Sequence, residues 1–127
     1  MDRAQWKRKI RTASKKAGTY KPFFDSIIDT LAGIMELRDK AQQQFEESGG
    51  HAVVRYTNKG GATNPAKNPA LIVIMDCNAQ ALAYWRDLGL TPAGLKKINE
   101  ESLKESSASS LEKALASFSF GDEGSDI

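Results

Sequence analysis

Basic residues crowd the start of the sequence, and the chemistry they support is phosphate binding. The first 21 residues contain Arg3, Lys7, Arg8, Lys9, Arg11, Lys15, Lys16 and Lys21. Many of these positions are three or four apart, which groups them on one face of a helix. Such a cluster attracts nucleic-acid phosphates without reading base sequence. Because Asp2 is the only nearby acid, we predict DNA binding here; the alternative is a solvated basic helix.

A second, smaller group of bases lies in the middle of the chain. Residues 51–64 combine β-branched and aromatic residues with a turn at Asn58–Gly61, which predicts a small β-hairpin or an extended loop. Arg55 and Lys59 there are further candidates for contact with a nucleic-acid backbone. Gly60-Gly61 lacks the Gly-Lys-Ser/Thr of a phosphate-binding loop, so nucleotide binding is rejected.

No set of residues that could converge for catalysis is apparent. The sequence has no Ser-His-Asp or Cys-His arrangement and no metal-ligand spacing. His51 and Cys77 are each the only residue of their type, so neither has a companion for metal binding or nucleophilic chemistry. We therefore predict that the protein is not an enzyme and that it uses no cofactor and no metal.

Length and composition predict a single domain with polar arms. The chain has 127 residues, of which 40% are hydrophobic, and a formal charge of +2. That small net charge hides a basic start and an acidic end. No apolar run is long enough to span a bilayer, and the lone cysteine fits a reducing compartment. A soluble, intracellular protein without membrane contact is expected.

The helical pattern predicts a mainly α fold. A basic arm (1–21) would precede a core (22–99) with helices at about 22–47, 69–88 and 92–99 and the hairpin or loop between the first two. The 22–47 helix would be near 40 Å long, more than a small domain can cover. Either its far end bends back, or it packs against another copy of the protein. We therefore expect apolar side chains of both long helices to contact other copies of the protein. They are Phe24, Ile28, Leu31, Met35, Leu71, Met75, Leu82 and Trp85.

The remaining residues, 100–127, predict a flexible acidic tail. Residues 99–110 are polar and serine-rich, and a short amphipathic helix is expected at about 110–119. Its apolar side would bind a partner protein through Leu111, Leu115, Phe118 and Phe120. The alternatives are that this helix folds back on the core, or that the acids lie against the basic arm.

Two motifs carry a resemblance to a known family. Asn68-Pro69-Ala70-Leu71 opens an apolar helix, and Leu88-Gly89-Leu90-Thr91-Pro92 closes it and starts the next. Together they resemble the small terminase subunits of tailed double-stranded-DNA phages. The resemblance covers the middle and last third of the chain; the first third matches only in general character. Ala93-Gly94 departs from relatives that often carry a polar residue and an arginine there.

The resemblance implies a function. It suggests a non-catalytic protein that forms a homo-oligomeric ring, recognises viral double-stranded DNA and regulates the terminase large subunit, an ATPase and nuclease, in the cytoplasm of the bacterial host. Two alternatives remain open: a helix-turn-helix-like DNA-binding regulator and a purely structural oligomer. The regulator is weakened because the segment after Pro92 offers no Arg, Asn or Gln to bases before Lys96.

Overall fold

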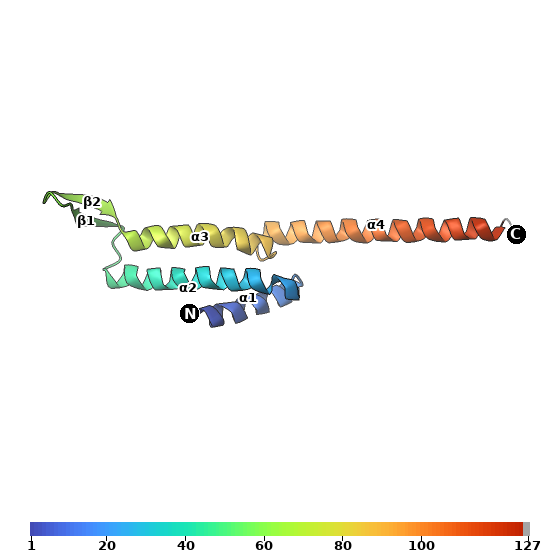
Figure 1. Cartoon of the computed structure of the whole chain (residues 1–127), viewed down its shortest axis with the longest axis horizontal. Coiled ribbons are helices and arrows are strands. Elements are labelled where there is room, and N and C mark those ends of the chain that lie inside the picture. The colour runs from blue at the N-terminus through green and yellow to red at the C-terminus, as the bar shows by residue number, and fades with distance from the viewer. Residues whose placement is uncertain (126–127) are drawn as a thin grey trace.

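Four α-helices and one β-hairpin make up the part of the chain that the structure, a computed structural model, describes (Figure 1). The structure describes residues 1–125, and the side chains of these residues except 106 and 118–125. The elements are α1 (Arg3–Ala17), the short 3-10 turn η1 (Pro22–Phe24), α2 (Asp25–Glu47), β1 (Val53–Thr57), β2 (Thr63–Lys67), α3 (Pro69–Asp87) and α4 (Pro92–Ser125). The predicted mainly α fold with a small hairpin between the long helices is confirmed.

Local sequence signals set the helix ends. The Asp2 side chain accepts a hydrogen bond from the Gln5 backbone amide, and the Gln5 side chain accepts one from the Asp2 backbone amide. This pair of bonds is a capping box at the start of α1. The Asn68 side chain caps α3 by accepting from the Ala70 amide, with Pro69 at the first helical position. Gly89 adopts φ 71°, and the Leu90 amide donates to the Trp85 carbonyl at 2.8 Å. This is the expected left-handed close of α3.

The core forms where α2 lies between α1 and α3 (Figure 1). Trp6 and Ile10 from α1 meet the buried side of α2, and Ala81 and Leu88 complete the cluster from the α3 side. The buried Thr19 hydroxyl donates to the Leu88 carbonyl at 2.8 Å, which ties the α1–α2 connection to the end of α3. Three helices therefore enclose a core within a single chain.

The side chains expected to contact other copies fall into three groups by their exposure. Ile28, Leu31 and Met35 are buried in the chain's own core, so they are not available to a second copy. Phe24 and Trp85 pack against that core and are partly buried, as is Leu71. Met75 is 63% exposed and Leu82 is 48% exposed. Contact between copies stays a prediction, and the α3 surface is where it would occur. Ile28, Leu31 and Met35 are buried within the chain because α1 and α3 both cover that side of α2.

The hairpin extends further along the chain than residues 51–64. Its strands pair antiparallel from Thr57 opposite Thr63 to Val53 opposite Lys67. The second strand continues to Lys67 because it pairs with the full length of β1. Pro65 is tolerated within it because both strands of a two-stranded ribbon are edge strands, where a residue without an amide hydrogen can sit. The Asn58 side chain closes the turn by accepting from the Gly60 and Ala62 amides.

α4 differs from the expected tail. Instead of a helix ending near residue 99, a linker and a second helix at 110–119, one helix runs from Pro92 to Ser125. Between residues 95 and 120 the sequence has no Gly or Pro, and its Leu, Ala, Glu and Lys residues favour helix continuation over the weaker preference of serine for turns. Every described side chain from 99 to 117 is exposed. The side chains of Phe118 and Phe120 lie outside the described residues.

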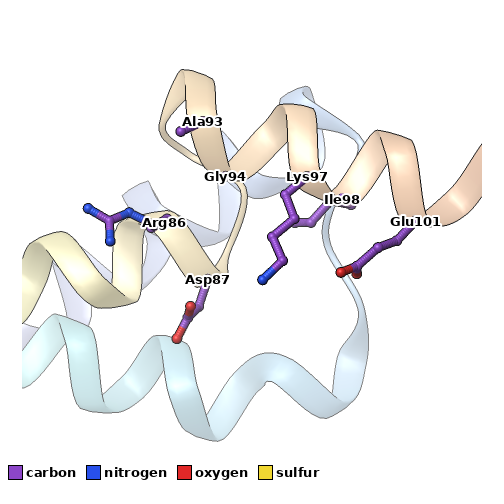
Figure 2. A pocket seen from close by; sticks show the side chains of 7 residues that line it. All are labelled: Arg86, Asp87, Ala93, Gly94, Lys97, Ile98 and Glu101. Atoms are coloured by element: carbon purple, nitrogen blue, oxygen red, sulfur yellow. The ribbon is translucent and has the colours of Figure 1, made fainter.

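The corner between α3 and α4 depends on Gly94 (Figure 2). A Cβ at this position would overlap the Arg86 carbonyl oxygen of the preceding helix. Gly94→Ala is therefore expected to destabilise the protein by about 1–3 kcal/mol, since the backbone has to move. Chemical denaturation measures this effect.

Gly33→Ala is the matched control for that substitution. Gly33 lies inside α2, where a Cβ would meet only the flexible end of the Arg3 side chain, at 3.2 Å. Because alanine favours a helix by about 1 kcal/mol over glycine, this change is expected to be neutral or stabilising. Equal losses from the two substitutions would contradict the corner's dependence on Gly94.

Candidate nucleic-acid interface

The bases of α1 fall on two faces with different surroundings. The inner face carries Arg3, Lys7 and Arg11, one turn apart, toward α2. Arg3 forms a two-bond pair with Asp29, with N–O distances of 2.8 and 3.2 Å, and Lys7 Nζ lies 3.8 Å from the same carboxylate. Arg11 pairs with Asp25 in the same way, at 3.0 and 3.3 Å. These three bases hold α1 on α2, and their charge is locally balanced.

The outer basic face consists of Arg8, Lys9, Lys15 and Lys16, all exposed. Arg8, Lys9 and Lys16 border a shallow hollow of about 340 Å³ on this side of α1. Within the described residues, none of the four lies within 4.0 Å of a carboxylate oxygen. The outer basic face is thus an unneutralised cationic surface. Lys21 is also exposed, just beyond the end of α1.

Aromatic rings lie beneath two of these lysines. Lys9 Nζ sits 5.0 Å from the centre of the Trp6 ring, and Lys15 Nζ sits 5.0 Å from that of Tyr20. Contacts of this kind favour a cation at the ring face while leaving the ammonium group exposed to solvent. They position the charges without neutralising them.

Asp39 on α2 anchors the start of α1. Its Oδ2 accepts from Trp6 Nε1 at 2.7 Å and from the Met1 amino group at 3.1 Å, and its Oδ1 accepts from Arg38 Nη2 at 3.0 Å. Burial raises the pKa of this carboxyl group, but the hydrogen bonds from Trp6, Arg38 and the amino terminus outweigh burial and hold the pKa below its usual value. The charged form of Asp39 therefore stabilises the fold.

A loss of stability at acid pH is expected from Asp39. Because its pKa is lower in the folded than in the unfolded state, its contribution is present above about pH 4 and is lost as pH falls below that value. Asp39→Asn should lower the free energy of unfolding by about 1–3 kcal/mol at pH 7. The difference from the unsubstituted protein should shrink toward pH 2. Urea unfolding at several pH values measures it, and a difference constant with pH would contradict the assignment.

The basic residues of the hairpin form a separate group. Arg55 and Lys59 are exposed, and so is Lys67 at the end of β2. The sequence has no acid from residue 48 to 75. Arg55 borders a hollow of about 260 Å³ with Thr63, Asn64 and Pro65. The hairpin projects from the end of the α2–α3 pair that is remote from the α3–α4 corner, whereas α1 lies along α2 (Figure 1). The structure does not bring the two groups of bases together.

The α3–α4 corner holds another hollow, of about 400 Å³ (Figure 2). Arg86 and Lys97 contribute cations to its lining and Asp87 and Glu101 contribute carboxylates, so it favours neither sign of ligand. At this corner α3 and α4 continue nearly end to end (Figure 1). The helices of a helix-turn-helix cross at about 90–120°, and the corner does not have that form.

Four acids of α2 contact α1, and their spacing is visible in the sequence. Asp25 and Asp29 pair with the inner bases, Glu36 accepts from the Arg3 backbone amide, and Asp39 accepts from Trp6 and the amino terminus. These acids lie four, seven and three residues apart along α2, a spacing that places them on one face of a helix. That spacing predicts a shared face, but it does not say which helix lies opposite.

Cys77 is buried and its pKa is raised by burial. Within the described part of the chain, no group of three or more His, Cys, Asp or Glu is placed to hold a metal ion.

Comparison with known proteins identifies the family. The family model described as "Phage terminase, small subunit" matches residues 3–105, from the start of α1 into α4. No curated protein and no solved structure matches the chain. Within residues 1–125, no helix combines the length and apolar character needed to cross a membrane. Because the family match covers well over half of the 127 residues, the chain belongs to the phage terminase small-subunit family.

Proposed function

We propose that this protein is a non-catalytic DNA-binding adaptor in phage genome packaging. It binds viral double-stranded DNA and regulates the large ATPase and nuclease subunit, in the cytoplasm of the bacterial host. Family membership supports the packaging role. The observation that carries DNA binding is the outer basic face of α1, whose four cations have no carboxylate within 4.0 Å in the described structure.

The outer basic face suits a phosphate backbone. From Arg8 to Lys16 the helix advances about 12 Å at 1.5 Å per residue, comparable to the axial rise of three or four nucleotides at about 3.4 Å each. The exposed Thr12 adds a hydroxyl to the same side. Contacts of this kind give affinity and orientation without sequence readout. The inner bases contribute less, because their carboxylate partners on α2 already neutralise them.

Self-assembly is part of the proposal. One copy offers a few unneutralised cations, and several copies in a ring would present many of them to one duplex. Joined binding sites raise overall affinity without any new contact. The exposed Met75 and Leu82 on α3 support contact between copies. We assign contact with the large subunit to the end of the chain, through Leu111, Leu115, Phe118 and Phe120 and the acids that follow them, on the sequence alone.

A salt titration tests DNA binding. Fluorescence anisotropy of a labelled duplex, with protein added at several salt concentrations, gives the dependence of log K on log salt. Four or five phosphate contacts per bound chain predict a slope of about −4. Absence of binding at low salt would refute the proposed function.

A further inference from the structure

The outer half of the β-hairpin stands clear of the helices. Every side chain from residue 55 to 65 is exposed, and even the large ring of Tyr56 is 61% exposed. The hairpin projects beyond the end of the α2–α3 pair (Figure 1). A two-stranded ribbon alone is marginal in water, so this segment adds little to the stability of the core. Its exposed strands suit contact with another molecule.

Strand pairing divides the hairpin into two faces. Residues opposite each other in an antiparallel pair share a face, and neighbours along one strand alternate between faces. We call the open face the Arg55 face, and its residues are Val53, Arg55, Thr57, Thr63, Pro65 and Lys67. All of them are exposed. The opposite face continues into the half-buried Val54 and Ala66, so the Arg55 face is the more accessible of the two.

All charged side chains of the hairpin are positive. Arg55 and Lys67 lie on the Arg55 face, and Lys59 lies at the turn. Among the described residues, none of these three has a carboxylate oxygen within 4.0 Å. The nearest acids along the chain are Glu47 and Asp76, and Asp76 lines the same hollow as Lys67. The unneutralised charge is therefore on Arg55 and Lys59, away from the helices.

The size and the polar groups of the hairpin match the major groove of duplex DNA. That groove is about 12 Å wide and 8.5 Å deep and admits a two-stranded ribbon. At about 3.4 Å per residue, β1 extends roughly 14 Å from Val53 to Thr57, which exceeds the depth of the groove. An arginine there can donate two parallel hydrogen bonds to O6 and N7 of guanine. The Thr57 and Thr63 hydroxyls, 3.1 Å apart on the Arg55 face, add further polar groups.

The buried Asn68 fixes the hairpin relative to the helices. Its Oδ1 accepts from the Ala70 amide at 3.0 Å, which caps α3. Its Nδ2 donates to the His51 carbonyl at 3.0 Å and to Ser48 Oγ at 3.2 Å. Its backbone amide donates to the Ala52 carbonyl at 2.9 Å. One residue thus joins both ends of the hairpin to the start of α3, and a preorganised element loses less conformational entropy on binding.

We propose that the hairpin enters the major groove of duplex DNA with the Arg55 face toward the bases and Arg55 hydrogen-bonded to guanine. Lys59, at the turn, contacts a phosphate that borders the groove. This inference rests on the proposed DNA binding and adds to it a second contact with a different role. The outer basic face of α1 holds the phosphate backbone, and the hairpin reads base edges.

Replacing guanine with 7-deazaguanine tests the base contact, because it removes the N7 acceptor from the major groove and leaves the phosphates in place. Anisotropy titrations compare two duplexes of G·C pairs that differ only in this base. The unsubstituted protein should bind the 7-deazaguanine duplex roughly 5-fold more weakly. Arg55→Gln should bind both duplexes equally. The matched control, Lys59→Gln, removes the same charge and should retain the difference, since its partner is a phosphate.

The outcomes separate this inference from the proposed function. An unsubstituted protein that binds neither duplex refutes DNA binding, and the groove contact with it. Equal binding of the two duplexes overturns the groove contact alone and leaves DNA binding to the outer basic face. A difference that survives in Arg55→Gln overturns the assignment of Arg55. Light scattering of Arg55→Gln should give the mass of the unsubstituted protein, and a lower mass would overturn the proposal by making the hairpin a contact between copies.

Discussion

Replacing Arg8, Lys9, Lys15 and Lys16 with glutamine is expected to weaken binding to duplex DNA roughly 100-fold at low salt. Each phosphate contact removed should also reduce the slope of log K against log salt by about one, so four replacements should flatten it by 3 to 4. The four side chains are exposed and lie outside the core, so the fold should be retained. Anisotropy titrations of the variant and the unsubstituted protein measure both quantities.

The control variant for this prediction removes the same amount of positive charge from α4 instead of α1. Lys96, Lys97, Lys104 and Lys113 are exposed on α4, and their replacement with glutamine lowers net charge by the same four units. If DNA responds only to overall charge, the two variants will bind equally weakly, and the outer basic face is then not the site. A much smaller loss for the α4 variant locates binding on α1.

Leu31→Ala is expected to lower the free energy of unfolding by about 2–5 kcal/mol. Leu31 has no exposed surface and lies in the cluster shared by α1, α2 and α3, so truncation removes buried apolar contacts and leaves a cavity. Because small domains are marginally stable, this is a large share of the total. Urea unfolding followed by circular dichroism measures the change.

Leu37→Ala makes the same chemical change six residues further along α2. Leu37 is 53% exposed, so its truncation should change stability by no more than about 0.5 kcal/mol. The pair also tests the position of Leu31 in the fold. If Leu31 lay between copies instead, its truncation would reduce the mass of the assembly while leaving single-chain stability nearly unchanged.

The sequence alone predicts the features that depend on near neighbours. Asn68-Pro69 and Gly89-Leu90 mark the two ends of α3, because a side-chain cap, a proline without an amide hydrogen and a glycine at positive φ each act within a few residues. The helical spacing of apolar residues in α2 and the turn residues after β1 are equally local. The mainly α fold and the hairpin follow from such signals, and the resemblance to small terminase subunits was drawn from motifs in the same segments.

Tertiary structure decided which side chains pair or pack within the chain and which stay exposed on its surface. The sequence treats Lys7 and Arg8 alike; only the packing of α1 on α2 pairs Lys7 with Asp29 and leaves Arg8 exposed. It likewise treats Leu31 and Met75 alike, yet the first is in the core and the second is on the surface. Periodicity shows which residues share a face, but the partner of that face is set by contacts between segments far apart in sequence.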